Sequence, residues 1–194
     1  MILTAQQQAA LNDIVSFIES TDTNDKVFIL SGYAGTGKTT IIKEILKSCQ
    51  GNDTRGILLM APTGKAAKVL RERTSFNDAC TIHSGIFSPN PVIVSQEDND
   101  VATTEVKLVF PLNSNKAHDF SWLCIIDEAS MVSSKETKNE DLIFGSGNML
   151  NDILSFVNRN SDSKVIFIGD PAQLPPVGDN TSNALSTEWF TSNG

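Results

Sequence analysis

The octapeptide GYAGTGKT at residues 32–39 restricts what this chain can fold into more than any other stretch of it. The octapeptide follows an apolar run of strand length, residues 27–30, and it precedes a helical pattern at 39–47. It matches G-x-x-x-x-G-K-[ST], in which glycines let backbone N–H groups turn inward around phosphate oxygens at a helix N-terminus. A strand, this loop and a helix in that order predict a P-loop on an α/β sheet.

Three further apolar runs have the length of strands and lack polar alternation, at residues 56–60, 123–126 and 165–168. Such runs are typical of strands that are buried on both faces of a parallel sheet. Helical patterns separate them at 65–73 and 148–157, and a first helix is expected at 4–19, where Thr4 and Gln7 match a capping box. The alternation predicts βαβ units and a doubly wound α/β fold.

Two stretches interrupt this alternation. Residues 84–120 contain three prolines and two strand-like pieces, at 92–94 and 106–110, with an acidic polar segment between them. We therefore predict a small β-hairpin insert with a solvent-exposed tip. Residues 133–147 are polar and predict a surface loop, while 181–194 predict a polar tail without a further element.

Composition limits the classes of function. The 194 residues are enough for one domain, and 15 basic against 23 acidic side chains leave a net charge of −8. This charge excludes a generally basic nucleic-acid coat, so any contact with DNA must rest on a local patch. Cys49, Cys80 and Cys124 form no C-x-x-C pair, which argues against a zinc site or a disulfide framework. Without a signal peptide or an apolar run of about 18 residues, we expect a cytoplasmic monomer with no membrane partner.

The P-loop and an acidic pair predict a site for a nucleotide and Mg²⁺. Lys38 is expected to reach the β- and γ-phosphates, and the Thr39 hydroxyl to bind the metal ion. Asp127 and Glu128 follow an apolar run; Asp127 would hold Mg²⁺ through its water shell, and Glu128 would polarise the attacking water as general base. The alternative for this pair is a helix N-cap. Nucleotide contacts are expected from Gly32, Ala34, Gly35, Thr36, Gly37, Lys38, Thr39 and Thr40.

Six segments occur in an order that resembles a known family. They are LTAQQ at 3–7, GYAGTGKTT at 32–40, APTGKAA at 61–67, TIH at 81–83, IDEASM at 126–131 and GDPAQLPPV at 169–177. The series is similar to the first RecA-like domain of superfamily 1B DNA helicases, the RecD-like and phage Dda-like group. The resemblance covers residues 3–178 and implies a RecA-like P-loop NTPase fold, ATP hydrolysis and 5′-to-3′ DNA helicase activity in repair or recombination.

The resemblance also implies roles for two glutamines. Gln7 resembles the glutamine that reads the adenine edge, which favours ATP over GTP; its alternative is a helix cap, and the two roles are compatible. Gln173 resembles the glutamine that senses the γ-phosphate and links it to DNA, and it joins Lys38 and Glu128 as a catalytic candidate. Its alternative is a polar loop residue after a strand.

The resemblance implies that four residues contact single-stranded DNA: Pro62, Thr63, Lys65 and His83. A loop hydroxyl, free backbone N–H groups and a helix N-terminus form a suitable phosphate seat after residue 61. Basic residues gather there (Lys65, Lys68, Arg71 and Arg73), although a solvated basic helix face is the alternative. His83, with Thr81, resembles the next DNA-contacting motif, and its alternative is a packed histidine.

The resemblance implies a division of the chain. Residues 1–83 and 121–180 correspond to a RecA-like ATPase domain 1A, and 84–120 to a small 1B domain whose hairpin acts as a strand-separating pin. Phe87 and Phe110 are candidates for the pin wedge or for the insert's own core. Trp122 and Trp189 are expected to be packing residues.

Full helicases of this group carry a second RecA-like domain with an arginine finger, and no such motif follows residue 177. We therefore expect a fragment with weak ATPase activity that does not unwind DNA alone and that requires the second domain in cis. Two other readings stay open. One is a stand-alone P-loop ATPase of another class, and the other is a nucleotide-binding interaction module without helicase activity.

Overall fold

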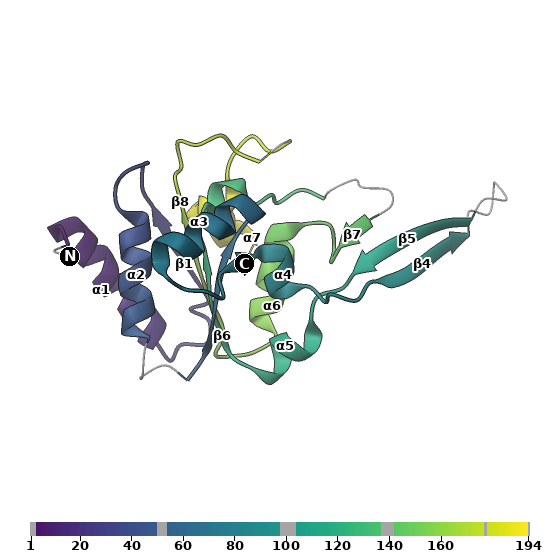
Figure 1. Ribbon diagram of the computed structural model, residues 1–194, viewed down its shortest axis with the longest axis horizontal. Helices are drawn as coiled ribbons and strands as arrows, with labels where there is room; N and C mark the ends of the chain where they lie inside the picture. The colour runs from purple at the N-terminus through teal and green to yellow at the C-terminus, as the bar shows by residue number, and fades with distance from the viewer. Residues whose placement is uncertain (1–2, 50–53, 98–103, 137–141, 177, 194) are drawn as a thin grey trace.

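The computed structural model describes residues 3–49, 54–97, 104–136, 142–176 and 178–193. Helices and strands alternate along this part of the chain (Figure 1). The helices are α1 (Ala5–Glu19), α2 (Lys38–Ser48), α3 (Gly64–Thr74), α4 (Ile82–Ile86), α5 (Ser114–Asp119), α6 (Met149–Asn158) and α7 (Thr187–Asn193), with 3₁₀ turns η1 (Ala129–Met131) and η2 (Asn183–Leu185). The strands are β1 (Val27–Ser31), β2 (Gly56–Ala61), β3 (Cys80–Thr81), β4 (Val92–Glu97), β5 (Thr104–Phe110), β6 (Trp122–Ile126), β7 (Leu142–Phe144) and β8 (Lys164–Gly169).

The main sheet has five strands in the order β1-β8-β6-β2-β3, and every pairing in it is parallel. Each of the four unalternated apolar runs of the sequence became one of its strands, as predicted. Because all strands point the same way, the loops after β1, β2, β6 and β8 leave from the same edge. This edge carries most of the residues selected from the sequence.

Helices cover both faces of the sheet, which confirms the doubly wound α/β fold. Side chains that alternate along β2, β6 and β8 divide between two hydrophobic cores, as successive strand residues must. One core packs under α1, α2 and α3; the other packs under α4, α5, α6 and the carboxy-terminal segment. The capping box predicted for α1 is present, with the Thr4 hydroxyl accepting from Gln7 N and the Gln7 amide accepting from Thr4 N.

The prediction of a polar tail after residue 180 is wrong. Residues 183–193 form η2 and α7, and Ala184 is fully buried. The Phe190 ring lies 5.7 Å from the Phe167 ring of β8, and Trp189 packs in the same core. The segment is mostly polar and gives no apolar pattern that would indicate a helix. Its few apolar side chains pack in the core of the main sheet.

The insert differs from its expected bounds. α4 begins at Ile82, and α5 buries Ala117 in the core of the main sheet, so the part of 84–120 that leaves the body is the antiparallel hairpin β4–β5 (Figure 1). The middle of the expected tip, 98–103, lies outside the described residues. The prediction of a surface loop at 133–147 is also wrong in part. This segment contains β7, which pairs in parallel with β5 and is the third strand of the sheet that the hairpin begins. A three-residue run is too short to signal a strand without its partner.

An aromatic cluster fixes the base of the hairpin. We use this term for His83, Phe87, Phe110 and Phe144, whose rings lie 4.5 to 5.9 Å apart in the contacting pairs. Phe87 is only 3% exposed, and Phe110 stacks on Phe144. Both phenylalanines therefore belong to the core that packs under α4, α5 and α6, and neither the expected wedge nor a separate core of the insert describes them. Trp122 is a packing residue, as expected, since its ring occupies the space beside Gly56.

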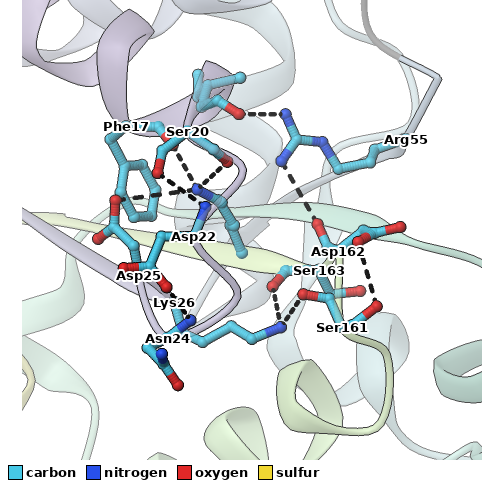
Figure 2. A network of polar contacts seen from close by, with 12 residues as sticks. Phe17, Ser20, Asp22, Asn24, Asp25, Lys26, Arg55, Ser161, Asp162 and Ser163 are labelled. Carbon is cyan, nitrogen blue, oxygen red and sulfur yellow. Dashed lines mark hydrogen bonds and ion pairs between the residues drawn. The ribbon is translucent and has the colours of Figure 1, made fainter.

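Three cations occupy the opposite edge of the sheet, where the strands begin. Lys164 is 3% exposed and donates to the carbonyls of Phe17 and Ser20 at 2.6 and 2.9 Å. Arg55 donates to Ile18 O at 2.8 Å and reaches Asp162 O, while Lys26 binds carbonyls of the turn after α6 (Figure 2). Lys164 and Arg55 satisfy carbonyls at the end of α1 that the helix itself leaves unpaired, and Lys26 gives a further donor to carbonyls of the turn that follows α6. A cavity of about 450 Å³ opens beside them, far from the residues predicted to be functional.

Replacing Lys164 by Met is expected to lower the free energy of unfolding by about 2–4 kcal/mol, because two buried carbonyls lose their donor. Urea unfolding followed by circular dichroism measures the change. Lys47→Met is the control, since this ammonium is exposed and pairs with Glu44 on the surface of α2; it should change stability by about 0.5 kcal/mol or less. Equal losses in both variants would contradict the assigned role.

Within the described residues, none of the helices has the length and apolar character needed to cross a bilayer.

Candidate functional site

One cavity of about 650 Å³ lies at the carboxyl edge of the main sheet. We call it the central cavity. Residues from four different strand ends line it, and most of those were selected from the sequence. They are Ala34, Gly35, Gly37, Lys38, Thr39, Thr63, Lys65, Asp127, Glu128 and Gln173, together with Ala66, Val69, Leu70, Arg73 and Met131.

The P-loop takes the conformation that its glycines allow. Gly35 and Gly37 have φ of 80° and 89°, and Gly37 forms the N-cap of α2. A Cβ at Gly37 would lie 2.3 Å from Gln7 Nε2, so a side chain there would displace the Gln7 amide from the loop. Gly32 N continues the β1–β8 pairing through Gly169 O at 3.0 Å. The loop therefore leaves β1 directly and turns at the start of α2, with the geometry that wraps backbone N–H groups around phosphate.

Lys38 and Gln7 are both held against this loop. Lys38 Nζ donates to Gly32 O at 2.6 Å and to Tyr33 O at 3.1 Å, carbonyls that it can exchange for phosphate oxygens. Gln7 Nε2 donates to Thr36 O at 2.9 Å, while its Oε1 caps α1. The structure thus brings Gln7 beside the P-loop from a distant part of the chain, but outside the lining of the central cavity.

Asp127 follows β6, and its backbone N–H continues the sheet by donating to Met60 O at 2.9 Å. The pKa of the Asp127 carboxyl is raised to about 6, chiefly because the group is buried. A hydrogen bond from the Glu128 backbone lowers this pKa, the Glu128 charge raises it, and the Lys38 and Arg73 charges lower it. Nearby cations therefore compensate the buried negative charge only in part. A cation bound here would complete the compensation.

Glu128 has left-handed backbone, with φ of 55°, and only Ser75 shares a positive φ among the non-glycine residues of the described part of the chain. It stands at the N-cap position of η1, yet its carboxylate makes no capping hydrogen bond there. The N-cap alternative for Glu128 is therefore wrong. Strained backbone of this kind is typical of functional sites. Glu128 also lines the central cavity, which is consistent with a functional role for its side chain.

The donor groups fit Mg²⁺ that arrives with a nucleotide. Within the described residues, no group of three or more His, Cys, Asp or Glu is placed to hold a metal ion. A Mg²⁺ site of the nucleotide type needs only one or two protein oxygens, because phosphates and water supply the others. The Thr39 hydroxyl and the Asp127 carboxylate, both in the lining of the central cavity, are such oxygens.

Gln173 reaches the central cavity from a tight turn after β8. Asp170, which is buried, accepts from Ala172 N at 2.9 Å, and its carbonyl accepts from Gln173 N at 3.2 Å. The Gln173 side chain then accepts a hydrogen bond from Ser130 Oγ at 3.0 Å. The residue is therefore anchored to the core rather than free in a loop.

The residues expected to contact DNA do not all lie together. Thr63 caps α3 by accepting from Ala66 N, and both Thr63 and Lys65 line the central cavity. Pro62 precedes them at the end of β2 and is outside this lining. His83 lies in the aromatic cluster beside a separate cavity of about 230 Å³, and burial lowers its pKa. His83 is therefore packed among aromatic rings, as one of its two interpretations expected. A contact between His83 and DNA stays a prediction.

Sequence reasoning missed two residues of the site. Arg73 lines the central cavity and acts electrostatically on Asp127, although the sequence showed it only as one of a basic group. Ser130 was part of the segment IDEASM but had no role of its own; its contact with Gln173 spans 43 residues of sequence. No local pattern signals a contact at that separation.

Comparisons with known proteins agree with this geometry. A model of the AAA domain family matches residues 16–179. The RecBCD enzyme subunit RecD of Buchnera aphidicola is 33% identical over 79% of this chain, and the ATP-dependent DNA helicase Dda of Enterobacteria phage T4 is 32% identical over 97% of it. The crystal structure of Pif1 helicase from Candida albicans superposes with a TM-score of 0.58 over 98% of the chain at 22% identity, a likeness of fold.

The chain spans 23% of the length of that RecD, 36% of Dda and 38% of the Pif1 chain. The segment that matches the family, residues 16–179, contains the P-loop and the acidic pair of this chain. The chain belongs to the AAA domain family and is a RecA-like ATPase domain of the superfamily 1B helicase type.

Proposed function

We propose that this chain is the ATP-binding and ATP-hydrolysing motor domain of an ATP-dependent 5′-to-3′ DNA helicase. The observation that carries the proposal is the convergence of residues from the ends of β1, β2, β6 and β8 on the central cavity. A chance glycine-rich turn would not bring a lysine, two acids and a glutamine into one cavity. The helicase activity rests on relatives that are DNA helicases by name.

The P-loop would bind the phosphates, with Lys38 moving from the carbonyls of Gly32 and Tyr33 to the β- and γ-phosphates. Thr39 and Asp127 would hold Mg²⁺, which neutralises charge on the phosphates when bound. Gln7 would read the adenine edge, and its place beside Thr36 leaves it near any nucleotide held by the loop. The other proposed nucleotide contacts are Gly32, Ala34, Gly35, Thr36, Gly37 and Thr40.

Glu128 would accept the proton of the attacking water, and its carboxylate is not engaged as a cap. Gln173 would report the presence of the γ-phosphate from its anchored position. The resemblance implies that a second RecA-like domain supplies an arginine to the transition state, and residues 1–194 tested by themselves would act without it. We therefore propose that this chain alone hydrolyses ATP slowly and does not unwind DNA.

Single-stranded DNA is the proposed partner, with Pro62, Thr63, Lys65 and His83 as contacts. Thr63 and Lys65 are exposed at the N-terminus of the eleven-residue α3, where backbone N–H groups favour a phosphate. Because Thr63 and Lys65 also line the central cavity, DNA held there would lie close to the nucleotide.

Steady-state ATP turnover of the full-length protein, with and without oligo-dT at low salt, tests the helicase assignment. We expect DNA to raise turnover about fivefold or more, which corresponds to about 1 kcal/mol removed from the activation barrier. Lys65→Ala should reduce the ratio of turnover with DNA to turnover without it. Lys47→Ala, at an exposed side chain in the last turn of α2, should leave this ratio unchanged. Turnover that does not respond to DNA would support a stand-alone ATPase instead, and nucleotide binding without turnover would support an interaction module.

A further inference from the structure

The contact between η1 and the turn after β8 is a feature that the proposed function leaves without a role. Ser130 is fully buried, and its hydroxyl donates to Gln173 Oε1 at 3.0 Å. Gln173 itself is exposed, so its side chain depends on this bond for a fixed position. A buried hydroxyl that holds an exposed amide sets how that amide faces the central cavity.

The direction of this hydrogen bond matters because the two ends of an amide differ chemically. Oε1 is occupied by the Ser130 hydroxyl, which leaves the Nε2 group with its two N–H donors for the cavity. Donors suit the oxygens of a phosphate. With the amide reversed, a carbonyl oxygen would face the phosphate and repel it.

The backbone around Ser130 is fixed from two directions. A Cβ at Gly169 would lie 3.1 Å from Ser130 N and 2.8 Å from Leu185 Cδ1, so the end of β8 approaches η1 as closely as glycine permits. The η1 turn also begins at Glu128, whose carbonyl accepts from Met131 N at 3.0 Å. Ser130 therefore links the turn that holds Glu128 to the turn that holds Gln173.

We propose that Ser130 is a positioning residue, which acts through Gln173 to make the central cavity distinguish nucleoside triphosphates from diphosphates. The inference rests on the proposed function, because it requires a nucleotide whose γ-phosphate reaches Gln173. Ser130 itself does not touch the nucleotide. Its hydroxyl orients the Gln173 side chain so that the Nε2 group faces the phosphate. Because Ser130 lies on η1, directly after Glu128 and Ala129, it also fixes the position of that group relative to Glu128.

The test compares the affinities for a fluorescent ADP and for a fluorescent, non-hydrolysable ATP analogue, both with Mg²⁺. In Ser130→Ala we expect affinity for the analogue to fall about three- to tenfold, the loss of one hydrogen bond to a positioned group. Affinity for ADP should stay within about twofold, because ADP has no γ-phosphate. In a Gln173→Ala background, Ser130→Ala should cause no further change in the ratio of the two affinities.

Ser163→Ala is the matched control. Ser163 is 1% exposed, and its hydroxyl accepts from Trp122 N at 2.9 Å at the opposite edge of the sheet. It should lower stability by a similar amount and leave the ratio unchanged. If Ser130→Ala does not fold, Ser130→Cys keeps the volume with a weaker donor and carries the same expectation.

Two results would overturn the inference: an unchanged ratio in the Ser130 variants, or a change that persists in the Gln173→Ala background. The nucleotide-free protein offers an independent readout, since the Gln173 side-chain amide signals in ¹⁵N spectra should shift in Ser130→Ala and not in Ser163→Ala. Wild-type protein that binds neither nucleotide would overturn the proposed function, and the inference with it. Wild-type binding with an unchanged ratio would overturn the inference alone.

Discussion

Glu128→Gln is expected to lower the rate constant of ATP hydrolysis by about 10²–10⁴-fold, the usual contribution of a general base. Gln has the shape of Glu but cannot take a proton from the attacking water. Nucleotide affinity should stay within about twofold, since the Glu128 carboxylate makes no capping bond whose loss would disturb η1. Single-turnover hydrolysis and a binding titration measure the two quantities separately.

Glu44→Gln is the control for this variant. Glu44 lies on α2, close in sequence to the P-loop, but it pairs with Lys47 on the helix surface and is outside the lining of the central cavity. Its hydrolysis rate should match that of the wild type. A Glu128→Gln protein that hydrolyses ATP at the wild-type rate would assign the general base to another group.

Asp127→Asn is expected to stabilise the nucleotide-free protein at pH 7 while it weakens the dependence of ATP binding on Mg²⁺, to which Thr39 would still contribute. Burial raises the pKa of Asp127 from an ordinary value of 3.8 to about 6. The folded protein therefore binds this proton more tightly than the unfolded chain, and the stability due to Asp127 falls as pH rises from about 4 to about 6. At pH 7 the charged carboxylate costs at most about 3 kcal/mol, which Asn would not incur.

Urea unfolding across pH 4 to 8 measures this effect. The difference in unfolding free energy between Asp127→Asn and wild type should grow as pH rises through 6 and then level off. Asp13→Asn, at an exposed side chain on α1, is the control and should change stability by about 0.5 kcal/mol or less. A variant less stable than wild type at pH 7 would contradict the buried, partly compensated charge that we assign to Asp127.

The main sheet could be predicted because its strands carry their own signal. Runs such as 123–126 are apolar without alternation, so each indicates a strand buried on both faces, and the P-loop fixes where the first βα unit turns. β7 and α7 could not be predicted in this way. β7 needs the edge of β5 as its partner, and α7 buries only a few side chains of a polar segment.

The residues of the candidate site also fall into those that local sequence predicts and those that only tertiary packing brings together. Lys38, Thr39, Asp127 and Glu128 lie in motifs whose spacing fixes their geometry, and the structure brings them to one cavity. The Ser130–Gln173 bond and the approach of Arg73 to Asp127 depend on tertiary packing between distant segments. His83 shows the opposite case, in which a motif residue lies among aromatic rings that only the fold assembles.

The central claim is that the central cavity binds ATP through Lys38 with Mg²⁺, and calorimetric titration of ATP into the chain tests it most directly. We predict binding that strengthens about tenfold or more when Mg²⁺ is added, that weakens by a similar factor in Lys38→Ala, and that exceeds binding of GTP. Affinity that is equal in wild type and Lys38→Ala, or that does not respond to Mg²⁺, would contradict the account.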